Sequence, residues 1–148
     1  SNDRNDWIIE KGTEIGVTDF HPIYSQNSER RKWNYNRMKK VSISAIKQSG
    51  NLWLPKIHSL ISFNSFLEQQ HIYNHKLMAH CKNGTKSELK KMTNNNVSQI
   101  IIIGPEGDFT SEEIDNAEKY GFKMISLGIN RLRTETACIS AISIMKLG

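Results

Sequence analysis

The C-terminal third of the chain, residues 98–148, switches repeatedly between apolar runs and glycine-containing turns. Four consecutive isoleucines at 100–103 predict a strand covered on both faces, as strands of parallel sheets are. A second strand is predicted over 123–127, and glycine and charged residues follow both strands, at 104–110 and 128–137. Ligands of open α/β sheets bind at the carboxyl ends of the strands. We therefore predict that these strands are adjacent and parallel, and that their turns form a binding and catalytic site.

Hydrophobic periodicity and capping residues predict the rest of the fold. Long helices are predicted over 6–15, 31–48 and 134–147. Two shorter helices are predicted to begin at the caps Ser65 and Thr110. Strands or extended segments are predicted over 18–24, 55–60 and 76–81. Because helices and strands alternate, we expect one α/β domain over 1–148, a parallel sheet with helices on both faces.

The net charge of +5 favours a polyanionic partner. The densest basic segment includes Arg30, Arg31 and Arg37, and Trp33 and Tyr35 lie within it. Cations attract phosphates and aromatic faces stack on unpaired bases, so this segment is a candidate RNA-binding surface. The alternative is a solvated helix face whose Trp33 belongs to the core.

Cysteine and histidine usage indicates neither disulfides nor a metal site. Cys81 and Cys138 fit no metal-ligand spacing, and we expect both to be small buried hydrophobes. A chain that needs no disulfide suits a reducing compartment, so a cytoplasmic protein is expected. No run of about 18 apolar residues is present, so no membrane is expected as a partner. His71 and His75 stand four apart but lack a third ligand, so we expect no metal.

The turn Gly104-Pro105-Glu106-Gly107 allows a ligand to approach its backbone closely. Neither G-x-G-x-x-G nor G-x-x-x-x-G-K-[ST] is present, which argues against the common dinucleotide and phosphate loops. Glu106 would repel a pyrophosphate, so this anionic turn suits a cationic or polar ligand better. Taken alone, the turn is also compatible with an ordinary strand-to-helix connection.

Three motifs, in order, resemble the RsmE family, 16S ribosomal RNA small-subunit methyltransferases of the SPOUT superfamily that act on N3 of a uridine. Early in the chain, Lys11-Gly12-Thr13-Glu14-Ile15-Gly16 resembles the family's Lys-x-Thr-Glu-Leu-Gly element, and Gln48-Ser49-Gly50 resembles its glutamine-serine helix end. The second motif is Gly104 to Gly107 followed by Phe109-Thr110. The third is Ser126-Leu127-Gly128 with Leu132-Arg133-Thr134-Glu135-Thr136-Ala137. The resemblance therefore covers nearly the whole chain.

The resemblance implies a parallel-sheet SPOUT methyltransferase domain with a C-terminal trefoil knot, and a homodimer that acts on the RNA of the small ribosomal subunit. It also implies an S-adenosylmethionine (S-adenosyl-L-methionine) pocket formed by the knotted loops. The residues expected to bind that cofactor are His80, Ile103, Gly104, Glu106, Gly107, Leu127, Gly128, Leu132, Arg133, Thr136 and Ala137. Ala137, Ile139, Ile142 and Met145 of the last helix are expected to contribute to the dimer contact. Complete members carry an amino-terminal RNA-binding β-barrel, which we expect to be absent from this chain because the similarity begins almost at residue 1.

Two departures from the family pattern bear most on the expected activity. Asp108 stands where a second glycine is usual, and Asn130 stands in place of an arginine. Either Arg131 takes over the RNA contact of that missing arginine, or the activity is weaker. Arg133 stays in register with the family's next arginine.

Methylation of uridine N3 needs removal of its imide proton or stabilisation of the developing anion. We expect Arg133 to stabilise the uridine or the cofactor carboxylate, and Glu106 and Glu135 are the candidate proton acceptors. Glu135 also suits a structural role at the N-terminus of the last helix, where carboxylates are favoured. His80 either lines the pocket or is a structural histidine.

A second interpretation is a non-catalytic RNA-binding or ribosome-assembly module that retains the knotted fold. Asp108, Asn130 and the missing barrel support it. Ribose 2′-O-methylation would need signatures that the sequence lacks. The methyltransferase remains the favoured interpretation.

Overall fold

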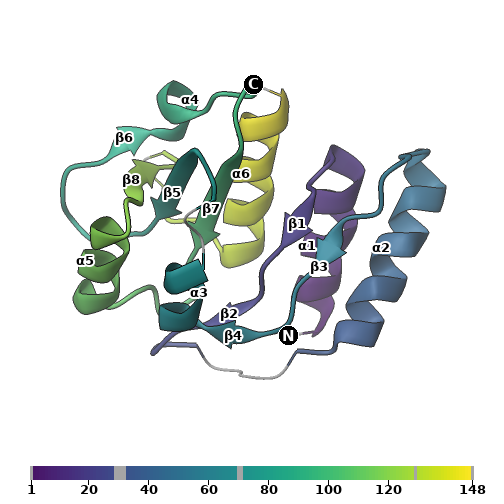
Figure 1. Ribbon diagram of the computed structural model, residues 1–148, viewed down its shortest axis with the longest axis horizontal. Coiled ribbons are helices and arrows are strands. Elements are labelled where there is room, and N and C mark those ends of the chain that lie inside the picture. The colour runs from purple at the N-terminus through teal and green to yellow at the C-terminus, as the bar shows by residue number, and fades with distance from the viewer. Residues whose placement is uncertain (1, 29–32, 70–71, 129, 148) are drawn as a thin grey trace.

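The computed structural model describes residues 2–28, 33–69, 72–128 and 130–147. Every strand pair among them is parallel, as the sequence predicts. The main sheet has the order β6-β8-β5-β7 (Figure 1). Its strands are β5 (His75–Ala79), β6 (Ser87–Glu88), β7 (Gln99–Ile103) and β8 (Lys123–Ser126).

The strand β5 occupies the centre of this sheet, so the prediction that β7 and β8 are adjacent was wrong. Both of them pair with β5 instead. A central strand is covered on both faces, and β5 supplies Leu77 and Met78, which are fully buried on opposite faces. The loop that follows β5 therefore begins at the same edge of the sheet as the two predicted turns.

Helices cover both faces of the main sheet, as predicted. The helices α3 (Phe63–Gln69) and α5 (Ser111–Lys119) pack on one face, where Ile100 and Ile102 of β7 join their cluster. On the other face, α4 (Leu89–Met92) and α6 (Thr134–Leu147) form a second cluster, against which Ile101 and Ile103 pack. The isoleucine run thus contributes to both clusters, which is why it is continuous rather than alternating.

The N-terminal part adds two helices and two short strand pairs beside α6 (Figure 1). The helix α1 (Asn2–Ile15) packs between α6 and α2 (Tyr35–Ser49). The strand β1 (Asp19–Phe20) pairs with β3 (Lys56–Ile57), and β2 (Ile23–Tyr24) pairs with β4 (Ile61–Ser62). Only part of the extended segment predicted over 55–60 is therefore strand. The strand predicted over 18–24 is divided around Pro22, which has no N–H to donate to a ladder.

The ends of the helices test the capping predictions. The capping box of Thr110 and Glu113 is confirmed at the start of α5. The helix α2 starts later than predicted because the Asn34 side chain caps it, accepting from the N–H of Arg37. The cap predicted at Ser65 was wrong, because Ser62 is the residue whose hydroxyl accepts from the N–H of Ser65. The short elements β6 and α4 were not predicted.

Two of the residues predicted at a dimer contact lie inside the fold. Ala137 and Met145 are buried within the chain, where α6 packs against α1 and against the sheet. No helix in the described part of the chain is long and apolar enough to cross a lipid bilayer.

Candidate active site

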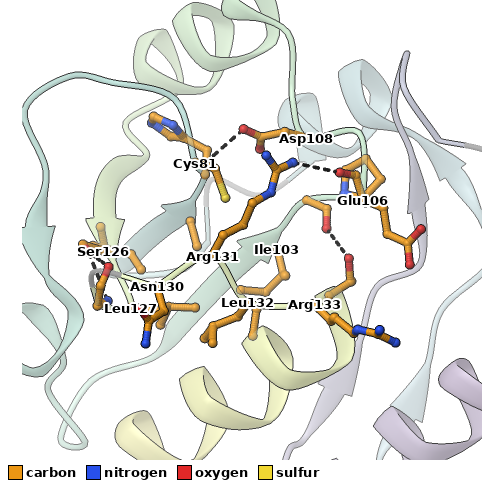
Figure 2. A pocket seen from close by; sticks show the side chains of 18 of the residues that line it. Cys81, Ile103, Glu106, Asp108, Ser126, Leu127, Asn130, Arg131, Leu132 and Arg133 are labelled. Carbon is orange, nitrogen blue, oxygen red and sulfur yellow. Dashed lines mark hydrogen bonds between the residues drawn. The ribbon is translucent and has the colours of Figure 1, made fainter.

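Three loops at the carboxyl edge of the main sheet surround a pocket of about 710 Å³ (Figure 2). Two of them are the predicted turns after β7 and β8. The third loop, residues 80–86, follows β5 and lies at the same edge because β5 lies between β7 and β8. The sequence therefore predicted the edge where the site forms, but only two of its three loops.

Most of the predicted site residues line this pocket. They are His80, Ile103, Gly104, Glu106, Leu127, Gly128, Leu132, Arg133 and Ala137, together with Arg131 from the predicted RNA-binding set. Gly107, Glu135 and Thr136 do not line it. The lining residues that sequence reasoning missed include Cys81, Lys86, Asp108, Ser126 and Asn130.

Gly104 is required by the packing beneath the pocket. A Cβ atom there would lie 2.9 Å from the Phe109 ring, which is fully buried. The Thr134 hydroxyl donates to the Gly104 carbonyl at 3.1 Å, which ties the start of α6 to this turn. The two predicted turns are therefore joined directly, and Gly104 forms part of the pocket wall.

Gly107, which does not line the pocket, packs against a distant part of the chain. A Cβ atom at this position would meet the Cβ of Asn27 at 2.9 Å. The Asn27 side-chain amide donates to the carbonyls of Gly107 and Asp108, each at 3.2 Å. Gly107 thus lets the segment around Asn27 pack on the back of the turn, a contact across 80 residues that spacing does not reveal.

Asp108 has a left-handed backbone, with φ of +63°. This conformation explains why glycine suits the position, and aspartate is one of the few other residues that tolerate it. The Asp108 carboxylate accepts from the N–H of Cys81 at 3.0 Å, across the top of the pocket in Figure 2. The departure from the family pattern therefore places a carboxylate in the pocket and joins two of its loops.

Replacing Asp108 with alanine is expected to lower the free energy of unfolding by about 1 kcal/mol more than replacing it with glycine. Both variants lose the bond to Cys81, so the difference between them isolates the cost of a left-handed backbone for a residue with a Cβ. Urea unfolding of the two variants measures it. Equal stabilities would contradict the left-handed conformation.

Glu106 does not present its carboxylate to the pocket as a free base. The carboxylate forms an ion pair with Arg4 of α1. The Glu106 carbonyl accepts from the Arg131 guanidinium at 3.2 Å, so Arg131 reaches from the third motif across to the second (Figure 2). Asp108 is therefore the lining carboxylate that is not paired with Arg4, and it shares the pocket with the cations Lys86, Arg131 and Arg133.

The other predicted catalytic residues stand at the start of α6. Arg133 is exposed and lines the pocket, and in Figure 2 its side chain diverges from that of Arg131. Glu135 lies in the first turn of α6, and its Oε2 is buried without a hydrogen-bond partner among the described residues. The helix dipole favours a carboxylate at this position, which agrees with the structural role predicted for it.

His80 lines the pocket as a neutral imidazole at pH 7. Partial burial, together with the charges of Lys86 and Lys82, lowers its pKa below the usual value, against the opposing charge of Asp108. Its Nδ1 accepts from the N–H of Lys82 at 3.1 Å, and its carbonyl accepts from the Lys86 ammonium at 2.7 Å. His80 therefore helps to order the 80–86 loop.

The basic segment is less available to RNA than its composition indicates. Arg37 donates to both carboxylate oxygens of Asp6 at 3.0 Å, so its charge is already paired. Trp33 packs against the core cluster of α1 and α2, which agrees with the alternative interpretation, while Tyr35 is exposed. Arg30 and Arg31 lie outside the described residues.

The two cysteines differ in their surroundings. Cys81 is exposed and lines the pocket, so the prediction that it is a buried hydrophobe was wrong. It follows β5 in a loop, where the sheet no longer covers it. Burial, and to a smaller degree the charge of Glu135, raises the pKa of the Cys138 thiol to about 12. Only Cys81 therefore stands where a thiol reagent can reach it.

We expect one of the two thiols of the folded chain to react rapidly with iodoacetamide, and Cys81→Ser to remove that reaction. Because Cys81 lines the pocket, S-adenosylhomocysteine at ten times its dissociation constant should slow the alkylation about tenfold. Mass spectrometry of the labelled chain measures both effects. An unchanged rate would mean that the ligand does not cover this side of the pocket.

A comparison with protein families places the chain in one of them. Residues 1–146 match the family described as the RNA methyltransferase domain. The chain belongs to this family. The resemblance found in the sequence is thereby confirmed, and the pocket lies in the part of the chain that carries the second and third motifs.

Individual members of the family agree closely with this chain. It is 36% identical over 139 residues to ribosomal RNA small subunit methyltransferase E of Mesomycoplasma hyopneumoniae, covering 90% of this chain and 60% of that relative. The crystal structure of a probable rRNA methyltransferase from Porphyromonas gingivalis superposes with a TM-score of 0.89 at 34% identity, over 97% of this chain and 61% of that one. Ribosomal RNA small subunit methyltransferase E of Neisseria gonorrhoeae, crystallised bound to S-adenosylmethionine, superposes with a TM-score of 0.88 at 31% identity, over 99% of this chain and 62% of that one. The chain thus spans about three-fifths of the length of these relatives.

Proposed function

We propose that the protein is an S-adenosylmethionine-dependent methyltransferase that acts on N3 of a uridine in 16S ribosomal RNA. The pocket formed by the three loops after β5, β7 and β8 carries this proposal. The relatives support the proposal in two ways. Proteins named ribosomal RNA small subunit methyltransferase E match nearly the whole chain, and one of them was crystallised with this cofactor.

The pocket fits the size and chemistry of S-adenosylmethionine. Its volume of about 710 Å³ lies within the range of sites that enclose a ligand of this size. Ile103, Leu127 and Leu132 give it apolar walls for an adenine ring. The Asp108 carboxylate supplies negative charge for a ligand that carries a sulfonium and an ammonium group.

The residues of the chain would position the reactants rather than supply the methyl group, which the cofactor carries in activated form. Gly104 and the loop after β8 would hold the cofactor. Arg133, at the mouth of the pocket, would stabilise the negative charge that develops on the uracil ring as N3 loses its proton. With Glu106 paired to Arg4, Asp108 is the pocket carboxylate that is left as a candidate proton acceptor.

Three finer features of the family complete the proposal. The C-terminal segment would form a trefoil knot, as the resemblance implies, and this knot would include the loops that Arg131 and Thr134 join to the turn after β7. The protein would act in the cytoplasm, where its ribosomal substrate is assembled. Residues 1–148 would form the methyltransferase domain, since the family model matches residues 1–146.

A methyl-transfer assay on small ribosomal subunits tests the proposed function. The chain, alone and fused to the amino-terminal region of a relative, is incubated with labelled S-adenosylmethionine and with subunits from cells that lack the enzyme. We expect label in 16S ribosomal RNA, and mass spectrometry of nuclease fragments should locate it as 3-methyluridine. Cofactor binding without transfer by either form would favour the non-catalytic RNA-binding module.

The protein is also proposed to be a homodimer, so light scattering is expected to report twice 17.0 kDa. An exposed apolar run supports an association of this kind, because Leu52 and Trp53 are 89% and 84% exposed. Of the predicted α6 positions, Ala137 and Met145 are buried within the chain, so Ile139 and Ile142, which are half-buried, are the two that remain for such a contact. A monomer at micromolar concentration would contradict the dimer.

A further inference from the structure

A second cluster of titratable side chains lies outside the methyltransferase pocket, where β1 pairs with β3. Asp19 is on β1, His21 follows that strand, and His58 follows β3. The N–H of His58 donates to the Phe20 carbonyl at 2.9 Å, which continues the parallel ladder by one residue. Residues two apart on a strand share a face, so this ladder holds Asp19 and His21 beside His58.

The three side chains converge. The His21 and His58 rings are stacked, with centroids 3.9 Å apart and planes 17° from parallel. The His58 Nε2 lies 2.9 Å from the Asp19 Oδ1. One ligand atom from each of the three residues lies within 4.8 Å of the other two. Donors bound to one tetrahedral Zn²⁺ at about 2.0–2.1 Å stand about 3.3 Å apart, and an imidazole binds along its ring plane, so one of the two stacked rings would turn to close this set around an ion.

A hydroxyl outside the cluster holds one of the two imidazole rings in place. The Tyr73 hydroxyl lies 3.2 Å from the His21 Nε2 and fixes the ring, as outer hydrogen bonds do for metal-bound histidines.

We propose that Asp19, His21 and His58 form a binding site for Zn²⁺, with water completing the coordination. Two imidazoles and one carboxylate suit Zn²⁺ and similar transition-metal dications, whereas Mg²⁺ and Ca²⁺ select oxygen ligands. The site opens into a hollow of about 460 Å³ that can admit the water. Lys56 borders the same hollow and opposes a cation, but it is exposed and can turn away.

The ion would add a link between β1 and β3, two short strands that backbone hydrogen bonds, the Asp19–His58 bond and the buried packing of Phe20 with Ile57 already join. Sequence reasoning did not find the site, because His21 and His58 are 37 positions apart and match no metal-ligand motif. None of the three residues lines the methyltransferase pocket. The proposal is therefore independent of the proposed function.

Calorimetric titration of the untagged chain with ZnCl₂ tests the site. We expect one Zn²⁺ per chain, a rise in the melting temperature, and binding at least tenfold weaker in His21→Gln and in His58→Gln. His75→Gln is the matched control, since it removes a histidine that bonds to the Met92 carbonyl outside the cluster. Cys81→Ser controls for binding by the exposed thiol.

Titration with CoCl₂ keeps the test decisive if a glutamine variant fails to fold. Co²⁺ at the proposed site should show visible d–d bands without a thiolate charge-transfer band, and excess Zn²⁺ should remove them. The proposal is overturned if the intact chain binds neither ion. Equal affinity in the His21 and His58 variants, or loss of binding in His75→Gln or Cys81→Ser, would also overturn it.

Discussion

Replacing Gly104 with valine is expected to weaken binding of S-adenosylmethionine about 100-fold or more. The first added carbon would lie 2.9 Å from the buried Phe109 ring, and the two methyl groups would enlarge the conflict. The turn would have to move, although Thr134 holds its carbonyl and Arg131 holds that of Glu106. Calorimetry with the cofactor measures the loss.

Two variants separate this local effect from general destabilisation. Gly50→Ala adds a Cβ at a left-handed helix end where nothing lies within 4 Å, so it should destabilise the fold without changing the affinity for the cofactor. Gly104→Ala should also bind weakly, and adding Phe109→Leu should restore part of the affinity by making room for the Cβ. If Gly104→Val binds the cofactor normally, the pocket is not the cofactor site.

Replacing Arg133 with alanine is expected to reduce methyl transfer about 100- to 1,000-fold, the usual effect of removing one group that stabilises developing charge. Most of the RNA affinity should remain, because the loss concerns the reacting base rather than phosphate contacts. Single-turnover transfer to small ribosomal subunits measures the rate, and filter binding measures the affinity. Arg133→Lys should recover part of the rate, since lysine keeps the charge but not the planar fork.

Arg131→Ala provides the matched comparison at the same pocket. Arg131 is exposed, so its loss should weaken RNA binding and lower the salt dependence by about one unit of slope if it contacts a phosphate. Its contact with the Glu106 carbonyl is lost as well, so cofactor affinity is measured in parallel. Normal transfer by Arg133→Ala would show that this arginine is not catalytic.

Local patterns in the sequence predicted most of the scaffold. The isoleucine run gave β7, the Thr110 capping box gave α5, and Gly16 and Gly50 marked the ends of α1 and α2. These features depend on residues within one or two turns of each other, so spacing alone reveals them. The split around Pro22 and the late start of α2, which Asn34 caps, also have local causes, and periodicity alone does not reveal them.

The sequence by itself determined an α/β chain with parallel strands, the edge at which its site forms, and the family that its motifs resemble. The tertiary structure decided which residues meet there. It put β5 between β7 and β8, paired Glu106 with Arg4, and brought Asp108 to Cys81. Strand order follows from burying apolar surface over the whole chain, and such contacts join residues tens of positions apart that no local spacing encodes.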